Sequence, residues 1–414
     1  MLQKVSLGVK DIDKYRMLVC SELVDEIVAL GNSLRGLRVC HINSTPFGGG
    51  VAELLSSQIP LMRGVGIEAD WQIIRGDRRF FTITKSLHNA LQGQPYPLIE
   101  MEATQRTYKS NNLANARELD PAYDVFIVND PQPAALRHFS DIPGAKWIWR
   151  CHVDSSEPDS TTWQFLRPFV EAYDAAVFTL DAFAPSDLRV PVLEFIPPAI
   201  DPINSKNMSL PSELWREMLD NLGIDKSRPL TAQISRFDPW KDPFGVMEAY
   251  RLVKKRVPGL QLALVTCFAG DDPEAWDIYG AVNEEAEKDP DIHILSNLTG
   301  VGNMEVNAFQ TASAVVIQKS IKEGFGLVVA ESLWKGTPVV AGNTGGIPMQ
   351  MEGGLSEFLV NSIEECADKV AYLLEHPEFA GELGREGKEH IRRRFLMPRL
   401  LRDELRLVKT LVEG

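Results

Sequence analysis

The chain has 414 residues, of which 44% are hydrophobic and 24% charged, and its formal net charge is -14 at pH 7. This length exceeds one ordinary hydrophobic core, and at about 100–200 residues per domain it predicts two domains. The negative charge argues against non-specific binding to nucleic acid or to an anionic membrane, because both need a basic surface. A small phosphorylated ligand stays compatible, since a few cations in a cleft outweigh the net charge locally.

Cysteine usage and the N-terminus indicate a protein of the cytoplasm. The cysteines number five, are scattered and form no C-x-x-C pair, which argues against a disulfide framework and a zinc ribbon. Residues 1–10 alternate polar and apolar side chains and lack the apolar core of a signal peptide. No apolar run approaches membrane-spanning length, so we expect a soluble cytoplasmic protein.

Short apolar runs rich in β-branched residues alternate with longer amphipathic stretches in the first half of the chain. Strands are expected at 37–43, 69–74, 123–129, 146–152, 175–180 and 192–196. A helix is expected at 51–63, directly after the first strand. This alternation predicts a parallel sheet that helices cover on both faces.

A proline-rich segment, PPAIDP at 197–202, separates the two halves because it cannot continue a central strand. We therefore expect two doubly wound domains, at 1–197 and 203–395. Residues 396–414 contain a basic and acidic amphipathic helix with no strand after it, which we expect to pack back on the first domain.

The second half repeats the alternation. Strands are expected at 230–235, 260–266, 292–296, 314–318 and 338–341, and helices at 211–222, 242–256, 273–288 and 327–334. Ligands of open α/β sheets bind beyond the carboxyl ends of the strands. Two such domains facing each other predict a cleft, and the chemistry is expected just after each strand.

A glycine-rich stretch follows the first expected strand. Residues 43–53 read NSTPFGGGVAE, so three glycines stand between a strand and a helix. Glycine lets backbone N–H groups approach an anion closely, and the helix start adds a positive dipole end. The stretch fits neither a Walker loop nor the G-x-G-x-x-G fingerprint. A phosphate or sugar contact and an ordinary flexible turn between a strand and a helix are equally good interpretations of this stretch.

Two cations follow the first strand of the second domain. Residues 235–243 read SRFDPWKDP and place Arg236 and Lys241 on either side of a proline-stiffened turn. Two fixed cations here suit a diphosphate and would stabilise the charge that grows on it as a glycosidic bond breaks. By themselves such cations are more often solvated surface residues.

The strongest local pattern is SIKEGFGLVVAE at 320–331, where a strand ends, a glycine turn follows and a helix begins near Gly326. Glu323 lies at the helix mouth, and Glu331, about one and a half turns inside, leans back toward it. Two carboxylates with exposed N–H groups between them can hold hydroxyls on both sides of a diphosphate. A lone glutamate would be a solvated cap, but this spacing favours function. A second glycine turn, GNTGGIP at 342–348, fits the same cleft or a plain connector.

In this order the stretches resemble the retaining glycosyltransferases of family 4, which have the α/β GT-B fold of two Rossmann-like domains. The resemblance covers nearly the whole chain. Its most specific elements are the spacing of Glu323 and Glu331, the pair Arg236 and Lys241, and PPAID at 197–201. The phrases SRFDPWK at 235–241, WRCHVD at 149–154 and NDPQP at 129–133 are most similar to the trehalose glycosyltransferring synthases. Retaining trehalose phosphorylases share the last two phrases in part.

The resemblance implies roles for the matching residues of the glycine and cation stretches. Gly49 and Gly50 face the diphosphate and the donor sugar, and Arg236 and Lys241 bind the diphosphate. His152 lies near the reacting carbon, although a lone histidine after an apolar strand is more often structural.

The resemblance also implies roles around the paired glutamates. Glu323 holds a donor-sugar hydroxyl, and Glu331 holds the ribose hydroxyls. The backbone of three residues contacts sugar and phosphate: Phe325, Gly326 and Leu327. Two further residues line the base pocket: Asn297 and Leu298.

The activity that the resemblance implies is the reversible synthesis of trehalose from nucleotide diphosphate glucose and glucose. It implies front-face substitution, in which the leaving phosphate takes the acceptor's proton. Arg236 and Lys241 then replace the metal of other glycosyltransferases, so neither a metal nor another cofactor is expected. The acidic pair Asp271 and Asp272 has no feature of a metal site. The residues themselves show no carboxylate pair that can be placed on the two faces of the scissile bond.

The acceptor pocket is expected in the first domain. Its candidate residues are polar and lie after or near the strands: Asn43, Arg78, Asp130, Gln132 and Arg150. A phosphate on the acceptor would need an extra basic cluster, for which Arg78, Arg79 and Arg150 are candidates.

Several alternatives stay open. A retaining trehalose phosphorylase would keep the cleft without a nucleotide, whereas a transferase could use a sugar phosphate or another polyol. A two-domain sugar-binding protein without turnover is the alternative from a different class. The sequence leaves open the base of the donor (UDP-, ADP- or GDP-glucose), the acceptor, the preferred direction and the oligomeric state, with a homodimer in keeping with the family.

Overall fold

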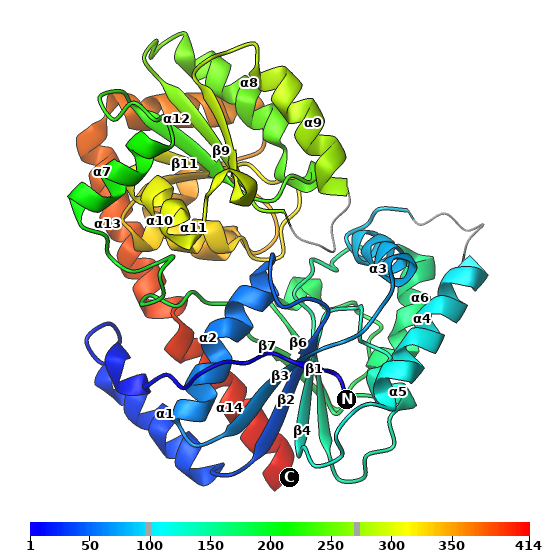
Figure 1. Ribbon diagram of the computed structural model, residues 1–414. Helices are drawn as coiled ribbons and strands as arrows, with labels where there is room; N and C mark the ends of the chain where they lie inside the picture. Colours follow the sequence, from blue (N-terminus) through cyan, green and yellow to red (C-terminus); the bar gives the residue numbers. More distant parts are fainter. Residues whose placement is uncertain (96–100, 269–273) are drawn as a thin grey trace. The chain divides into compact units, whose positions relative to one another are not determined.

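The computed structural model describes residues 1–95, 101–268 and 274–414 (Figure 1). The chain divides into two compact units. Met1–Pro198 and Met397–Gly414 form the first unit, and Ala199–Leu396 form the second. The change from one unit to the other therefore falls inside the proline-rich segment. Within the described ranges, no helix is long and apolar enough to cross a membrane.

The first unit is built on a seven-stranded sheet of order β1-β3-β2-β4-β5-β6-β7. All neighbouring strands are parallel except β1, which runs antiparallel to β3. The strands are β1 (Gln3–Lys4), β2 (Arg38–Asn43), β3 (Glu68–Ile73), β4 (Val125–Asn129), β5 (Lys146–Arg150), β6 (Ala175–Phe178) and β7 (Val192–Phe195). The central strands are apolar and buried because helices cover both faces.

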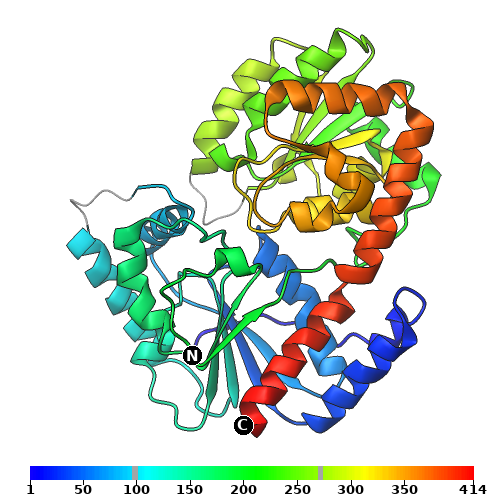
Figure 2. The same ribbon diagram turned by 180° about the vertical axis from the view of Figure 1, so that it is seen from behind.

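Figures 1 and 2 show α1, α2 and α14 on one face of this sheet and α3, α4, α5 and α6 on the other. These helices are α1 (Ser21–Ser33), α2 (Gly50–Gly64), α3 (Arg78–Leu91), α4 (Met101–Ala116), α5 (Leu136–Phe139), α6 (Ser160–Val170) and α14 (Met397–Glu413). The core under α3, α4 and α6 is aromatic, and the rings of Phe126 and Trp147 stack at 4.3 Å between centroids. Alternation along the strands turns His41 and Arg150 away from that core.

The second unit has a fully parallel six-stranded sheet of order β10-β9-β8-β11-β12-β13. Its strands are β8 (Leu230–Ile234), β9 (Gln261–Thr266), β10 (Ile292–Ser296), β11 (Val315–Gln318), β12 (Val339–Gly342) and β13 (Leu359–Val360). Its helices are α7 (Ser212–Asn221), α8 (Pro243–Lys254), α9 (Glu274–Ala286), α10 (Asn303–Ala312), α11 (Leu327–Trp334), α12 (Ile363–Glu375) and α13 (Pro377–Arg394). Each unit is thus Rossmann-like, as the sequence predicts.

Helix α14 returns the end of the chain to the first unit and lies beside α1 and α2 (Figure 2). Its apolar stripe is buried, and includes Leu401, Leu405 and Val408. Arg406 on the outer side pairs with Glu26 of α1. The expectation that the last helix packs on the first domain is confirmed.

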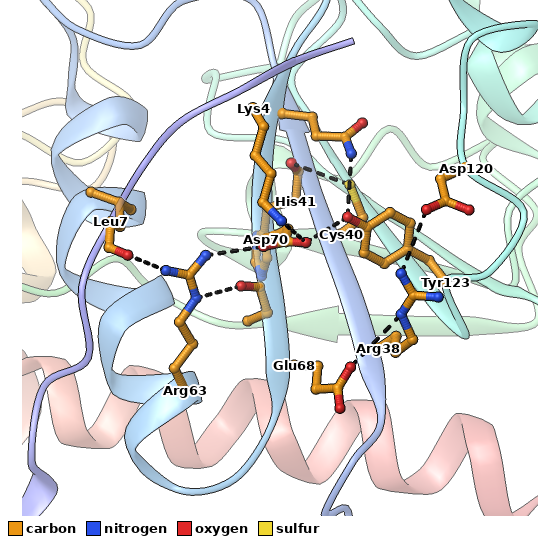
Figure 3. Close-up of polar contacts among 12 residues, drawn as sticks. Lys4, Leu7, Arg38, Cys40, His41, Arg63, Glu68, Asp70, Asp120 and Tyr123 are labelled. Carbon is orange, nitrogen blue, oxygen red and sulfur yellow. Dashed lines mark hydrogen bonds and ion pairs between the residues drawn. The ribbon is translucent and has the colours of Figure 1, made fainter. Parts of the chain in front are cut away.

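A polar network joins the N-terminal segment to the sheet around Asp70 of β3 (Figure 3). The carboxylate of Asp70 accepts hydrogen bonds from Lys4 Nζ at 2.6 Å, Tyr123 Oη at 2.6 Å and Arg63 Nη2 at 3.0 Å. Arg63 also donates to the carbonyl oxygens of Leu7 and Ala69. Burial raises the pKa of Asp70, but these donors outweigh burial and the pKa is lowered overall. The charged form of Asp70 therefore stabilises the edge strand β1.

We expect Asp70→Asn to lower the free energy of unfolding by about 1–3 kcal/mol near neutral pH, because three donors lose their ionised acceptor. The pKa of Asp70 is lower in the folded state, so this stabilisation is complete above the unfolded-state pKa and is lost as the pH falls through the folded-state pKa. Urea unfolding of both proteins between pH 7 and pH 3 measures it, and the difference should shrink at acid pH. Asp25→Asn, at an exposed ion pair with Arg16, is the control and should change stability little. A pH-independent difference would contradict the assignment.

Candidate functional site

The two glycine turns of the second unit pack against each other, backbone to backbone. A Cβ added to Gly345 would lie 1.7 Å from the carbonyl oxygen of Glu323, and one added to Gly342 would lie 2.1 Å from that of Ser320. Gly326, with φ +82°, ends the first turn as the N-cap of α11. These turns follow β11 and β12, which are hydrogen-bonded neighbours. The glycines therefore keep the loop that carries Glu323 in a single place.

Glu323 is 9% exposed and is held through one of its two carboxylate oxygens. Its Oε2 accepts from Lys241 Nζ at 2.6 Å and Ser320 Oγ at 3.2 Å, and Gln318 Nε2 lies 3.5 Å away. Within the described chain, Oε1 makes no such contact. An ionised carboxylate oriented by one oxygen can offer the other to a ligand hydroxyl.

The loop after β8 brings Lys241 to Glu323. Asp238 Oδ1 accepts from the backbone N–H of Lys241 at 3.1 Å, and Gln233 Nε2 donates to the carbonyl oxygen of Lys241 at 2.6 Å. The carbonyl oxygen of Trp240 accepts from the N–H of Ile321 at 2.7 Å and so joins this loop to the loop of Glu323. The structure thus brings together two residues that lie 82 positions apart in the sequence.

Arg236 begins the same loop at the carboxyl end of β8 and is partly exposed. Cys267, which follows β9, lies within electrostatic reach of Lys206 and Arg236. Burial raises the pKa of Cys267, and the two cations only partly oppose this. Cations therefore gather at the carboxyl ends of β8 and β9.

Glu331 differs from the expectation of an accessible carboxylate, because its exposed fraction is 0%. Its Oε1 lies 2.7 Å from Lys206 Nζ, and its Oε2 accepts from Gln310 Nε2 at 2.6 Å. Burial raises the pKa of Glu331, but Lys206 and Lys335 outweigh burial and lower it. The carboxylate is therefore ionised and enclosed, with Lys206 and Gln310 against it.

The other donor-side candidates lie directly after β10 and at the start of α11. The side-chain oxygen of Asn297 accepts from the backbone N–H of Phe268 at 2.9 Å, so Asn297 positions that loop. Leu298 is 61% exposed and presents an apolar surface after β10. Phe325 is buried, and its carbonyl oxygen accepts from Gln350, while Leu327 is the first residue of α11.

In the first unit, Asn43 positions the glycine loop. Its Nδ2 donates to the carbonyl oxygen of Thr45 at 2.8 Å, and its Oδ1 accepts from Trp71 Nε1 at 2.7 Å. Both ends of the amide are thus occupied, which differs from the expected contact with an acceptor.

Gly49 is the N-cap of α2, whose first residue is Gly50, and a Cβ added to Gly49 would meet nothing within 4 Å. The chain's own packing leaves the space beside Gly49 open.

His152 and Asp130 form a polar pair after β5 and β4. Asp130 Oδ1 accepts from the backbone N–H of His152 at 2.8 Å, and His152 Nε2 lies 3.0 Å from Asn129 Oδ1. Burial raises the pKa of Asp130 to about 6, against the opposing effects of the His152 N–H and of Arg150. Burial and then the Arg150 charge hold the pKa of His152 well below its usual range. His152 is therefore neutral near pH 7.

The remaining acceptor candidates are dispersed. Arg150 is buried, and its Nη1 donates to Glu404 Oε2 at 3.0 Å. It is therefore not open to an acceptor, in contrast to the expectation from the sequence. Gln132 is only partly exposed, and its Oε1 is buried without a donor among the described residues. Arg78 is exposed and lines a cavity of about 660 Å³ between α3 and α4 with Arg79.

No group of three or more metal-ligating side chains occurs in the described ranges. Asp271 and Asp272 lie outside the residues that the structure describes. Sequence reasoning did not single out four residues that contact candidate residues: Lys206 at Glu331, Gln318 and Ser320 at Glu323, and Glu404 at Arg150. Gln318 and Ser320 could have been found by their closeness to Glu323 in the sequence, whereas Lys206 and Glu404 lack any motif.

Two family models match the chain, one in each half. Residues 41–185 match the model described as trehalose synthase, N-terminal domain, and residues 216–390 match the model described as glycosyl transferases group 1. A trehalose synthase of Rubrobacter xylanophilus is 49% identical over 415 residues, covering 100% of both proteins. A trehalose phosphorylase of Pleurotus pulmonarius is 26% identical, and the match covers 85% of this chain but 54% of that protein.

The fold has relatives among solved structures. A UDP-forming α,α-trehalose-phosphate synthase of Burkholderia xenovorans matches with a TM-score of 0.70 and 14% identity, over 91% of this chain and 100% of that one. At this identity the likeness concerns the fold alone. The prediction of a GT-B fold with two Rossmann-like domains is confirmed.

We expect Glu331→Ala to lower the free energy of unfolding by about 3–5 kcal/mol, because it removes a buried ion pair with Lys206 and a hydrogen bond from Gln310. The isosteric Glu331→Gln should cost less, since an amide oxygen can still accept from Lys206. Urea unfolding followed by circular dichroism checks this. Lys226→Met is the control, because it removes a lysine of the same unit from a solvent-accessible ion pair with Asp220 and should change stability little. An unchanged midpoint in Glu331→Ala would show that the pair contributes nothing.

Proposed function

The chain belongs to the trehalose synthase family of glycosyltransferases, and on that premise we propose that it transfers glucose from a nucleotide diphosphate to free glucose, forming trehalose reversibly. The observation that carries the proposal is the Lys241–Glu323 pair in a GT-B fold, with Oε1 of Glu323 open to a ligand. Identity of 49% along the whole length of a trehalose synthase supports the choice of product.

We propose that the donor binds the second unit. Arg236 and Lys241 hold the diphosphate, together with the N–H groups of Phe325, Gly326 and Leu327 at the start of α11. Glu323 accepts a hydrogen bond from a hydroxyl of the donor sugar. Glu331 holds the ribose diol, which requires the ammonium of Lys206 to yield or share its place on Oε1. Leu298 offers an apolar surface to the base.

The transfer follows from these charges. The bond between the sugar C1 and the phosphate oxygen breaks, and its electron pair stays on the diphosphate, whose growing charge Arg236 and Lys241 stabilise. The acceptor hydroxyl attacks C1 on the same face, so the configuration is retained. Its proton passes to the leaving phosphate oxygen. The two cations make a divalent metal unnecessary, and the protein contributes orientation and charge stabilisation.

We propose that the acceptor binds the first unit near His152, Asp130 and Gln132. A neutral histidine and an orphaned amide oxygen suit the hydroxyls of an uncharged sugar. Gly49 and Gly50 would contact the donor from this unit, where the space beside Gly49 is open. All five thiols are unpaired, which supports a site of action in the reducing cytoplasm.

A sugar phosphate is the second candidate acceptor, because Arg78 and Arg79 line a cavity of about 660 Å³. Guanidinium groups are suited to phosphate oxygens. The phosphorylase alternative has less support, since the trehalose phosphorylase relative is 26% identical and extends well beyond this chain.

Glu323→Gln should lower kcat at least 100-fold in enzyme that is still folded by circular dichroism, because the amide loses the charge that Lys241 orients and that balances an oxocarbenium-like transition state. Glu357→Gln, an exposed glutamate of the same unit, is the matched control. Turnover of the folded Glu323→Gln variant at the wild-type rate would remove Glu323 from the site.

Proton NMR of the products tests the proposed function directly. Enzyme is mixed with UDP-, ADP- or GDP-glucose, and with glucose or glucose 6-phosphate, in the presence of EDTA. We expect a non-reducing α,α-linked disaccharide from free glucose. Transfer only to glucose 6-phosphate would favour the arginine-lined cavity, whereas phosphate-dependent cleavage of trehalose alone would favour the phosphorylase. Loss of transfer with EDTA, restored by magnesium, would contradict metal independence.

A further inference from the structure

The last helix places a buried carboxylate under the sheet of the first unit. Glu404 of α14 is 2% exposed, and its partners come from three other elements. Its Oε1 accepts from Gln58 Nε2 at 2.5 Å and lies 3.3 Å from His41 Nε2. Its Oε2 accepts from Arg150 Nη1 at 3.0 Å. Both oxygens of Glu404 are therefore occupied by side chains of α2, β2 and β5.

Arg150 connects this cluster to the pair Asp130 and His152. The second guanidinium nitrogen of Arg150, Nη2, donates to the carbonyl oxygen of Ile196 at 3.3 Å. Its backbone carbonyl oxygen accepts from the N–H of Asp130 at 2.8 Å, and Asp130 in turn accepts from the N–H of His152. Asp130 has φ +66°, a left-handed conformation that a residue other than glycine seldom adopts. The strained turn is thus held in part by the backbone of Arg150.

Arg150 also links Glu404 to Asp130 and His152 through its charge. The positive charge of Arg150 lowers the pKa of both Asp130 and His152, and His41 adds to the effect on His152. Glu404 is the first charge that balances Arg150, followed by Asp130 and Asp403. A buried ion pair is a weak source of stability compared with an apolar replacement, so a role limited to stability explains this cluster poorly.

We propose that Glu404 is a positioning residue for the acceptor side of the reaction, acting on Asp130 and His152 through Arg150. The inference rests on the proposed function, because Asp130 and His152 must contact the acceptor. Glu404 holds the guanidinium in place and balances its charge, so that Asp130 stays a basic carboxylate beside a neutral imidazole. The final helix then contributes to the acceptor site through the contact of Glu404 with Arg150.

Other charges of α14 lie close by and define the control. Arg399 donates to the carbonyl oxygens of Pro197 and Pro198 and pairs with Asp403, which Arg402 also contacts. Arg406 pairs with Glu26 on the outer side of the helix. Glu26→Gln therefore breaks an ion pair that ties α14 to the first unit without touching Arg150, and it should leave the kinetics unchanged.

The test is the pH dependence of kcat/KM for glucose in the full-length enzyme. Wild type should lose activity as the pH falls through about 6, where Asp130 becomes protonated. In Glu404→Gln the charge of Arg150 is no longer balanced, which favours ionised Asp130, so this acid limb should move down by roughly one pH unit. The KM for glucose should rise about 10-fold, while the KM for the nucleotide sugar stays within about two-fold.

Two further variants keep the result decisive. Glu404→Asp retains the charge but moves it away from Arg150 by one methylene. It should therefore raise the KM for glucose and leave the acid limb at its wild-type pH. This variant tests the inference if Glu404→Gln does not fold. An unshifted limb with an unchanged KM for glucose in a folded Glu404→Gln enzyme would overturn the inference. Asp130→Asn should abolish the acid limb, and a limb that survives in Asp130→Asn would instead refute the proposed role of Asp130.

Discussion

The ion pair between Lys241 and Glu323 depends on one constraint, the direct hydrogen bonding of β8 to β11. Val315 and Val316 of β11 lie in register with Thr231 and Ala232 of β8, so the loops that leave these strands emerge side by side. Parallel strands end at the same edge of a sheet, and residues far apart in sequence meet there. The hydrogen bond from Ile321 to Trp240 and the orientation of Glu323 follow from this pairing, whereas the packing of the two glycine turns follows from the pairing of β11 with β12.

The residues proposed to meet the two substrates differ in charge, although the first unit also encloses an ion pair, Arg150 with Glu404. In the second unit, lysines meet carboxylates in three enclosed pairs: Lys241 with Glu323, Lys206 with Glu331 and Lys319 with Asp242. In the first unit, burial instead favours the neutral form of His152 and raises the pKa of Asp130. Fixed charges suit an anionic diphosphate, and weakly charged polar groups suit an uncharged sugar. The division of electrostatics between the units matches the proposed division of substrates.

The sequence predicts the central strands of both sheets because each is a short apolar run buried on both faces. It does not reveal β1 and β13, which are two-residue edge strands whose pairing is set by tertiary contacts such as the Asp70 network. The sequence also gives no clear signal for many helices, among them α4 and α13, where apolar residues are sparse.

For the candidate site, the motif residues Lys241 and Glu323 do come together, but motif reasoning misjudged residues whose partners are remote. Arg150 looks available in the sequence, yet its partner Glu404 lies 254 positions away. Asn43 and Glu331 also meet partners that the sequence does not reveal, because a chemical type does not show which neighbour contacts it. Whether Gly49, Arg236 and Leu298 contact the donor stays a prediction.

The return of α14 to the first unit bears on how the protein is made. Strands β1 to β7 leave the ribosome early, but α14, which shares one face of their sheet with α1 and α2 and carries Glu404, is synthesised only after the whole second unit. At about 5–20 residues per second, roughly 10–40 s pass before α14 can cover its part of that face. The second unit is continuous in sequence and can close while the first is still incomplete. The second unit can therefore fold before the first unit is complete. During that interval the sheet of the first unit has an apolar face that is only partly covered and needs shielding from solvent and from other chains.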